Sequence, residues 1–395
     1  MVGVNESTPV VPGESDQALR IGLWLEPSQI PEELSFIGHL AMGLKSEGHT
    51  VCLLVPSATP MEQFSIFSDQ IIPLSAPLRG WRNILSGSLQ YYARPAAAPR
   101  DMNEVLAQCK ARDLQVVVLF GPSGLAFPDF AALPRTIPTL FWCWDMGDAQ
   151  GALPRLPGIS GVLGASEPML KMLENNHPAR SMLLRPGVFL AEDQEPRYHR
   201  KNQSPCFVCL DSLSGLSDFS NLLRACRDLA DAKQDFLMFL YDSGPDKHAI
   251  WKLTQSLDML DRVSFVPYRH DCESLLLYGD FYLQVANSPR LNYLVLQAMA
   301  RGLPVLGRIN AAADFCIDAQ SCQSVGGGGI ADWRQAMLLA LSADAEMRRV
   351  SASATQHLRQ HHSMSDMLTR FIALCRQAIA APIPFPQYAA KTVKH

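Results

Sequence analysis

Hydrophobic positions along the chain follow two spacings, one typical of buried strands and one typical of helices. Residues 34–45 place Phe36 and Leu40 on one face of a helix. Short apolar runs at 18–25 and 50–55 flank this segment and are typical of buried strands. A strand, a helix and a strand with short connections usually form a parallel unit, so the pattern predicts the start of a parallel sheet.

The same alternation continues along the chain and is interrupted by one polar, proline-containing stretch at 191–205, which is predicted to be a linker. In the first half, further strands are predicted at 114–120, 139–144, 161–164 and 181–185, and helices at 102–112 and 167–175. In the second half, strands are predicted at 207–210, 236–241, 263–266, 281–285 and 304–307, and helices at 219–232, 248–257, 273–278, 294–301, 331–342, 344–360 and 364–380. The predicted fold class is α/β, with two Rossmann-like doubly wound parallel-sheet domains facing across a cleft.

This pattern divides the chain into a series of expected parts. They are a disordered tail at 1–18, a first Rossmann-like domain at 19–190, the linker at 191–205, a second Rossmann-like domain at 206–362, and a helix with a tail at 363–395.

The composition supports two packed domains and excludes several classes of protein. The chain has 395 residues, of which 48% are hydrophobic and 18% charged, so it can fill two cores and is unlike a disordered protein. A net charge of −4 provides no basic surface for nucleic acid. No apolar run approaches the roughly 20 residues that span a bilayer, and the N-terminal stretch is unlike a signal peptide. We therefore expect a cytoplasmic protein.

Ten cysteines are scattered along the chain, which favours free buried thiols over a disulfide framework. Cys206 and Cys209 form a C-x-x-C pair at the start of a predicted strand. Positions i and i+3 of a strand face opposite sides, so these thiols are predicted to lie in the core rather than on one metal ion.

Several short motifs occur in the order found in one family of enzymes. Residues 297–306 read QAMARGLPVL, after DRVSF at 261–265 and LLLYGD at 275–280, and the first half carries ASE at 165–167 and RPGV at 185–188. These motifs resemble those of the family 4 retaining glycosyltransferases. The resemblance runs from the first predicted strand to the helix at 331–342 and implies the GT-B architecture.

The resemblance also implies an activity: transfer of a sugar from a nucleotide-sugar to a glycan, lipid or protein acceptor, with retained anomeric configuration and without a metal ion. The acceptor would lie on the side of 19–190 and the donor on the side of 206–362. The helix at 364–380 would cross back and pack on the first domain. The basic and aromatic segment at 79–94 is predicted to be a solvated acceptor-side loop or, alternatively, a peripheral contact with an anionic membrane.

The donor site departs from the family pattern where negative charge must be bound. A departing nucleoside diphosphate requires cations or helix N-terminal amides. The family supplies an arginine and a lysine after the first strand of the second domain, and Ser212 and Ser217 stand at these positions. Asp211 and Asp218 beside them are expected to repel a diphosphate.

Other donor contacts of the family are replaced as well. Gln297 stands at the second of two family glutamates and retains the ability to bond a ribose hydroxyl. Pro289, or Leu291 if a gap is allowed, stands at the first. The segment 27–33, PSQIPEE, contains no glycine where the family has a glycine-rich loop. The donor site is therefore predicted to be eroded.

Candidate site residues follow the ends of the predicted strands. The predicted donor-binding residues are Ser212, Ser217, Ser288, Arg290, Asn292 and Gln297. Arg290 is also the predicted substitute cation, and together with Asp145 it forms the candidate catalytic pair. The alternatives are a surface arginine at position 290 and a helix N-cap at Asp145.

On the acceptor side, the candidates are Trp142, Trp144 and Arg185. The two indole rings are suited to stacking on a sugar, and the alternative is a buried aromatic pair. Arg185 is suited to binding a phosphate, and the alternative is a surface arginine. The run of four glycines at 326–329 lacks the lysine of a phosphate-binding P-loop and is predicted to be an ordinary loop.

Two functional hypotheses follow. The ordered motifs favour an active glycosyltransferase with an altered donor site, which is an argument from fold and family. The joint replacement of both cations and both glutamates favours a catalytically inactive homologue that acts as a glycan-binding or partner-enzyme scaffold.

Overall fold

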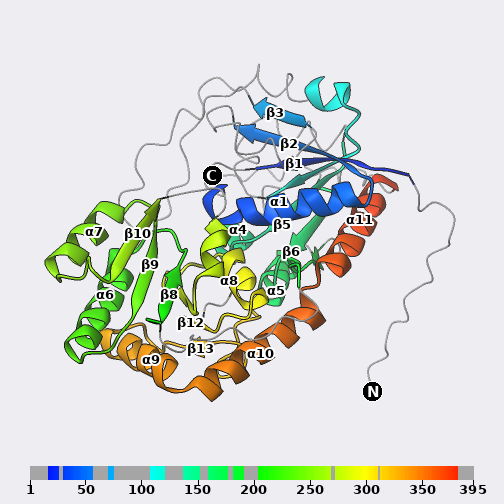
Figure 1. The fold of residues 1–395 in the computed structure, drawn as a ribbon. Coiled ribbons are helices and arrows are strands. Elements are labelled where there is room, and N and C mark those ends of the chain that lie inside the picture. Colours follow the sequence, from blue (N-terminus) through cyan, green and yellow to red (C-terminus); the bar gives the residue numbers. More distant parts are fainter. Residues whose placement is uncertain are drawn as a thin grey trace, which may run out of the picture.

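The fold consists of two parallel sheets with helices packed on their faces (Figure 1). In the computed structural model, the described residues are 17–25, 30–56, 70–74, 107–120, 137–151, 159–176, 181–190, 203–267, 272–309 and 312–380. Within them the first sheet has seven strands and the second has six, and no strand is shared. This confirms the predicted architecture of two doubly wound halves.

The first sheet has the order β3-β2-β1-β4-β5-β6-β7, so the direction of winding reverses between β1 and β4. Its strands are β1 (Arg20–Trp24), β2 (Thr50–Pro56), β3 (Gln70–Leu74), β4 (Val116–Leu119), β5 (Thr139–Cys143), β6 (Gly161–Gly164) and β7 (Ser181–Leu183). The described helices of this half are α1 (Ile30–Ser46), α4 (Met146–Gly151) and α5 (Glu167–Asn176). Helix α1 begins before the predicted segment because the first turn of a helix tolerates the missing N–H of Pro31.

The second sheet has the order β10-β9-β8-β11-β12-β13 and reverses between β8 and β11. Its strands are β8 (Cys206–Cys209), β9 (Leu237–Asp242), β10 (Val263–Pro267), β11 (Phe281–Gln284), β12 (Val305–Gly307) and β13 (Gln323–Ser324). Its helices are α6 (Leu216–Asp231), α7 (Lys247–Ser256), the 3₁₀ helix η5 (Cys272–Leu277), α8 (Tyr293–Ala300) and α9 (Ile330–Ser342). They are followed by α10 (Asp344–His361) and α11 (Met364–Ala380).

Strand β8 shows how the sequence pattern produces this packing. Cys206 and Val208 belong to one hydrophobic cluster, whereas Phe207 and Cys209 belong to another on the opposite face of the sheet. Both cysteines are buried free thiols, and burial raises the pKa of Cys206 to about 12. The C-x-x-C pair is therefore part of the core, as its position on a strand predicts.

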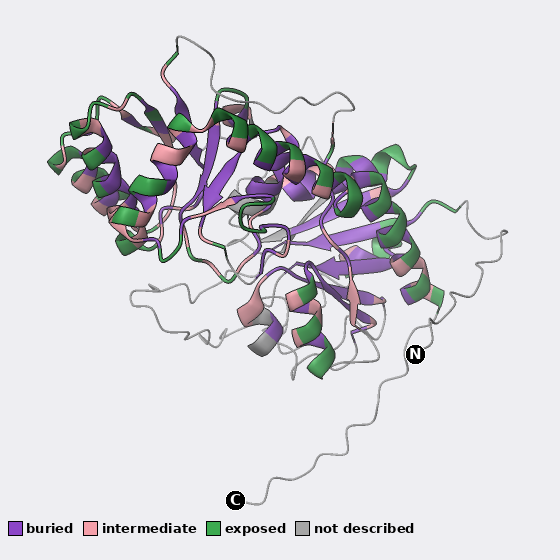
Figure 2. Ribbon diagram, turned by 90° about the horizontal axis from the view of Figure 1, so that it is seen from below, coloured by how far each residue is buried: buried purple, intermediate pink, exposed green. Residues whose placement is uncertain are grey.

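The two halves share one hydrophobic core. A central cluster joins the inner face of the first sheet, helices α1, α8 and α11, and the inner face of the second sheet. Two further clusters cover the outer faces, one against α6 and α9 and the other in the first half. Figure 2 shows buried residues continuing from one sheet to the other. Domains joined by a large apolar interface move relative to one another less readily than domains joined by a small polar one.

Helices α8 and α11 form much of this shared core. Every residue of α8 is buried, and α8 lies between α1 and α10. Helix α11 packs against α1 and against strands β4 and β5 of the first sheet. Its Phe371 ring stacks on Trp142 with a centroid distance of 5.7 Å. The segment that follows the second domain thus completes the core of the first.

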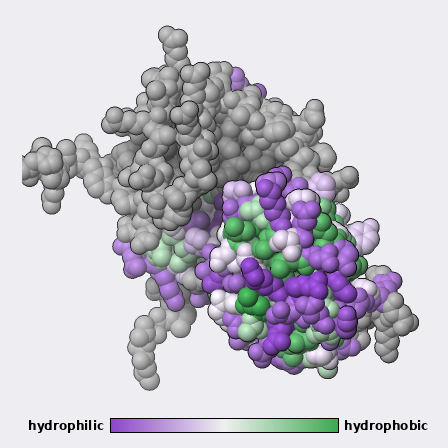
Figure 3. Space-filling model, turned by 90° about the vertical axis from the view of Figure 1, so that its left-hand side faces the viewer, coloured by the Kyte–Doolittle hydropathy of each residue, from purple (hydrophilic) through white to green (hydrophobic). Residues whose placement is uncertain are grey.

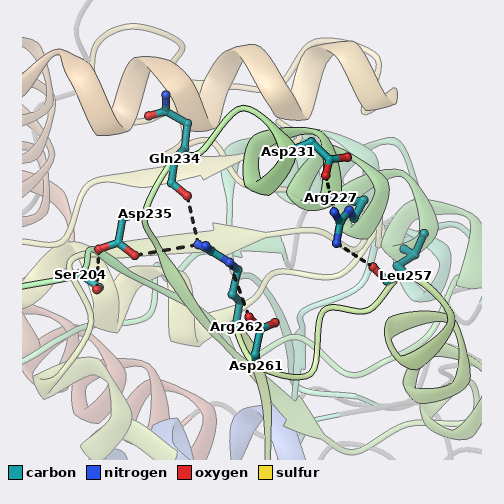
Figure 4. A network of polar contacts seen from close by, with 8 residues as sticks. All are labelled: Ser204, Arg227, Asp231, Gln234, Asp235, Leu257, Asp261 and Arg262. Atoms are coloured by element: carbon teal, nitrogen blue, oxygen red, sulfur yellow. Dashed lines mark hydrogen bonds and ion pairs between the residues drawn. The ribbon is translucent and has the colours of Figure 1, made fainter.

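A polar network fixes the amino ends of β9 and β10, at the edge opposite the strand carboxyl ends (Figure 4). Arg262 donates to the Gln234 carbonyl at 3.0 Å, and its guanidinium lies 5.5 Å from the ring centroid of Phe236. The carboxylates of Asp235 and Asp261 each lie 3.9 Å from Arg262. Figure 3 shows the face of the second half that lies on the left in Figure 1. This face mixes hydrophilic and hydrophobic side chains, as a solvated surface does.

Candidate functional site

The carboxyl ends of β8 and β11 mark the point where the second sheet reverses its winding, and open parallel sheets bind ligands in the crevice at such a point. At this point the Asp211 carboxylate bonds within the protein. Asp211 follows β8, is 3% exposed, and accepts hydrogen bonds from the backbone N–H groups of Val285 at 2.6 Å and Ala286 at 2.9 Å. Its other oxygen accepts from Asn292 Nδ2 at 2.7 Å.

This arrangement gives Asp211 internal partners, which the sequence does not indicate. Successive backbone N–H groups form an anion-binding concavity, and the Asp211 carboxylate fills it from within the protein. The Tyr282 hydroxyl lies 3.4 Å from the same carboxylate. The charge is thus buried and bonded within the protein.

Asn292 holds the start of α8. Its Oδ1 accepts from the Leu294 N–H at 3.0 Å, which is an N-cap, while its Nδ2 donates to Asp211. The sequence analysis assigns Asn292 to donor binding. In the structure both polar atoms of its side chain bond within the protein.

Asp145 and Arg290 meet directly, because the two halves are joined by an antiparallel β-bridge at these residues. The Met146 N–H donates to the Pro289 carbonyl at 3.1 Å, and the Leu291 N–H donates to the Trp144 carbonyl at 2.9 Å. Backbone from the first half therefore bonds directly to backbone from the second.

The Asp145 side chain performs a local role as well. Its Oδ1 accepts from the Gly147 N–H at 2.6 Å, immediately before α4 begins at Met146. This is the N-cap geometry that was the alternative to a catalytic role.

The candidate tryptophans lie inside the shared core. Trp142 and Trp144 are both buried, and their ring centroids lie 5.2 Å and 4.6 Å from that of Phe36. Tyr293 of α8 enters the same cluster, 5.0 Å from Phe36, and its hydroxyl donates to the Gly187 carbonyl at 2.8 Å. With the halves packed in this way, neither indole face is available to a sugar.

Gln297 and Arg185 also bond across the junction. Gln297 is buried, with its Nε2 3.3 Å from His39 Nδ1 of α1, and its Oε1 accepts from Arg301. Arg185 forms ion pairs with Glu167 at 2.7 Å in the first half and with Asp314 at 3.0 Å in the second. Each candidate therefore contributes to the contact between the halves.

A buried histidine lies beside the Arg185 pair. His362 Nδ1 is 2.8 Å from the Pro186 carbonyl, so this nitrogen carries the proton. Burial lowers the pKa of His362 to about 3, and the side chain is held neutral. The Val188 N–H donates to the His362 carbonyl at 2.8 Å, which joins the end of α10 to the first half.

The three candidate serines are more accessible. Ser212 is half-buried and Ser217 is exposed in the first turn of α6. Ser288 Oγ accepts from the Arg290 N–H at 3.2 Å and lies on the loop between β11 and α8. These hydroxyls lie on loops and a helix end that follow the strand carboxyl ends.

The sequence analysis missed two charged residues at this edge. Asp246 Oδ2 accepts from the N–H groups of Gly215 at 2.8 Å and Leu216 at 3.2 Å, so it neutralises the positive end of α6. Arg308 follows β12 and pairs with Asp218 at 2.9 Å. Asp218 is thus partnered by a cation. The position of Arg308 directly after a strand was the signal that could have identified it.

Two further properties of the described residues bear on the site. These residues contain no group of three or more histidine, cysteine, aspartate or glutamate side chains placed to hold a metal ion. Within the same residues, no helix combines the length and apolarity that crossing a membrane requires.

Comparison with known proteins places the fold among glycosyltransferases. The chain matches no profile of a known protein family. It is 26% identical over 106 residues to an uncharacterised glycosyltransferase of Haemophilus influenzae, a match that spans 27% of this chain and 30% of that protein. The two halves together superpose on much longer stretches of solved structures.

Sucrose-phosphate synthase from Thermosynechococcus elongatus has a TM-score of 0.70 at 15% identity, covering 92% of this chain and 100% of that one. Anabaena HepE in complex with UDP and glucose also has a TM-score of 0.70, at 11% identity and with 91% and 100% coverage. A glycosyltransferase from Rickettsia africae has a TM-score of 0.68, at 11% identity and with 92% and 99% coverage. The fold is therefore GT-B, as the motif resemblance implies.

Proposed function

We propose that this protein transfers a sugar from a nucleotide-sugar donor to a glycan, lipid or protein acceptor, with retention of anomeric configuration, at the junction of its two sheets. The observation that carries the proposal is the match over nearly the whole chain to GT-B structures, including one described as a complex with UDP-glucose. Open parallel sheets bind their ligands at the carboxyl edge, where Ser212, Ser288 and Arg290 lie.

In this proposal the donor diphosphate lies at the carboxyl edge of the second sheet, and the sugar lies between the loop of Asp145 and the loop of Arg290. Hydroxyl groups of Ser212 and Ser288 donate to phosphate oxygens, which partly offsets the absence of the family cations. The bridge between Asp145 and Arg290 separates so that the sugar lies between the two loops, and the loops on either side exclude water from the reacting bond. In keeping with the family resemblance, we expect transfer to continue in the presence of EDTA.

The test is a turnover assay with UDP-, GDP- and ADP-sugars, in which released nucleotide is measured with and without added oligosaccharide acceptors. We expect one donor to be consumed, and we expect Arg290→Ala to lower that rate. Arg349→Ala serves as the matched control, because Arg349 is an exposed arginine of α10 that pairs with Glu346 on the same helix. A chain that binds none of the three nucleotides and consumes no donor contradicts the proposal.

A second candidate is a catalytically inactive homologue that binds a glycan or a partner enzyme. The specific observation in its favour is that the donor positions are closed by internal contacts: the carboxylate of Asp211 and the backbone bonds of Pro289 and Leu291. Restoring the two family cations with Ser212→Arg and Ser217→Lys distinguishes the candidates. A gain of nucleotide binding without turnover supports the inactive homologue, whereas turnover in the wild type supports the enzyme.

A further inference from the structure

Arg308 is the centre of a polar cluster at the carboxyl edge of the second sheet. It leaves the end of β12 and reaches the first turn of α6, where Nη1 lies 2.9 Å from Asp218 Oδ1. The two side chains are 23% and 24% exposed, so the pair is accessible from solvent on one side. An arginine in this setting retains N–H donors beyond the one that its partner accepts.

The four-glycine loop holds the Arg308 side chain in place. Gly328 has a φ of +75°, and a Cβ at this position would lie 2.8 Å from Arg308 Cδ and 3.1 Å from its Nε. Asn221 of α6 donates from Nδ2 to the Gly328 carbonyl at 3.0 Å and fixes the loop over the arginine. The loop is therefore shaped to let the guanidinium pass, which gives the run of glycines a physical reason.

Two helix N-termini also lie at this position, and each is already bonded to a carboxylate of the protein, α6 to Asp246 and α9 to Asp332. The loop leads directly into α9, which packs beside α6, so the N-termini of two helices lie near the guanidinium. Each N-terminus carries a partial positive charge. At the α6 end, Asp246 already bonds to two N–H groups, and Asp218 alone is paired with Arg308 among the described ion pairs.

We propose that Arg308 binds the diphosphate of the donor nucleotide and that Asp218 is an internal counter-ion, which the diphosphate displaces. The guanidinium pairs with Asp218, the residue after Ser217, where the family resemblance places a lysine, and it comes from the end of β12. A planar guanidinium binds phosphate through two parallel hydrogen bonds, which an ammonium group does not. This inference rests on the proposed function, because it names the cation that the donor site otherwise lacks.

The test measures binding of UDP, uridine and inorganic pyrophosphate by isothermal titration calorimetry. Arg308→Ala should weaken UDP and pyrophosphate about tenfold or more, as expected for a lost charge-assisted bond, and leave uridine unchanged. Arg308→Lys should recover part of the affinity. Asp218→Asn should tighten UDP, because the competing carboxylate is removed while Arg308 remains; a purely structural ion pair gives no such gain. Arg349→Ala is the control, and circular dichroism checks that each variant is folded.

The outcomes separate this inference from the proposed function. If UDP binds and a donor is consumed, but Arg308→Ala and Asp218→Asn bind UDP as the wild type does, the role of Arg308 is refuted and the proposed function stands. If pyrophosphate binds through Arg308 while no nucleotide binds, the anion site stands and the proposed function is refuted. If the wild type binds neither pyrophosphate nor any of UDP, GDP and ADP, both are refuted.

Discussion

The buried carboxylate of Asp211 provides the sharpest test of how this fold is held together. Replacing Asp211 with alanine removes the acceptor for the Val285 and Ala286 N–H groups and for Asn292 Nδ2. Each buried donor left without a partner costs about 1–3 kcal/mol, and removing a charged member of a buried network typically costs about 3–5 kcal/mol in all. We therefore expect Asp211→Ala to lower the free energy of unfolding by about 3–5 kcal/mol, out of a total of about 5–15 kcal/mol.

Urea denaturation followed by circular dichroism measures this loss. Asp211→Asn keeps one acceptor oxygen but directs an amide NH₂ toward Asn292, so its loss should be intermediate. Asp261→Ala is the control, because its carboxylate is largely exposed and lies 3.9 Å from Arg262. Added phosphate should raise the melting temperature of Asp211→Ala more than that of the wild type, since an anion can occupy the vacated N–H groups. Equal stability of Asp211→Ala and Asp261→Ala contradicts the assignment.

Three further predictions concern the junction. Burial lowers the pKa of His362 from an ordinary 6.5 to about 3, so between these pH values the unfolded chain binds a proton that the folded chain does not. The free energy of unfolding should therefore fall as pH falls from about 6.5 toward 3, by up to about 1.4 kcal/mol per pH unit. His362→Asn should flatten this slope in urea melts. Gly187→Ala should lower the free energy of unfolding by about 1–3 kcal/mol, because the added Cβ would lie 2.7 Å from Met364 Cα. Gly327→Ala is the control and should unfold at nearly the wild-type urea concentration, because its Cβ would lie 3.4 Å from an aspartate oxygen. Phe371→Ala should cost about 3–5 kcal/mol and change the tryptophan fluorescence, because its ring stacks on Trp142; unchanged fluorescence counts against that contact.

Much of the fold follows from local spacing. Strands with uniformly apolar residues, such as Val116–Leu119 and Gly161–Gly164, are recognisable because parallel strands are buried on both faces. The elements that the sequence analysis missed are β3 with its internal proline, the short helix α4 and the two-residue strand β13. None of these is long enough to show a period, and β3 exists through pairing with β2, which is a non-local contact.

The candidate site was less predictable than the fold, because its character depends on pairings between distant residues. The serines at positions 212 and 217 are visible in the sequence. The burial of the Asp211 carboxylate is not, because its partners Val285 and Ala286 follow β11, which lies beside β8 only in the folded chain. Likewise, Arg308 and Asp218 are separated by 90 positions, and nothing local indicates that they pair. Propensity and periodicity report burial, whereas the partner of a charge is determined by topology.

The packing of α11 on the first sheet has a consequence for how the protein is made. During synthesis the first sheet emerges well before Phe371, yet Trp142 completes its stacking only when that residue arrives. Domains generally fold as units from the N-terminus onward. Here the first half leaves the ribosome with an apolar face uncovered, and this face stays exposed while the whole second half is translated. A fragment that ends at the linker lacks this cover, and we expect it to aggregate.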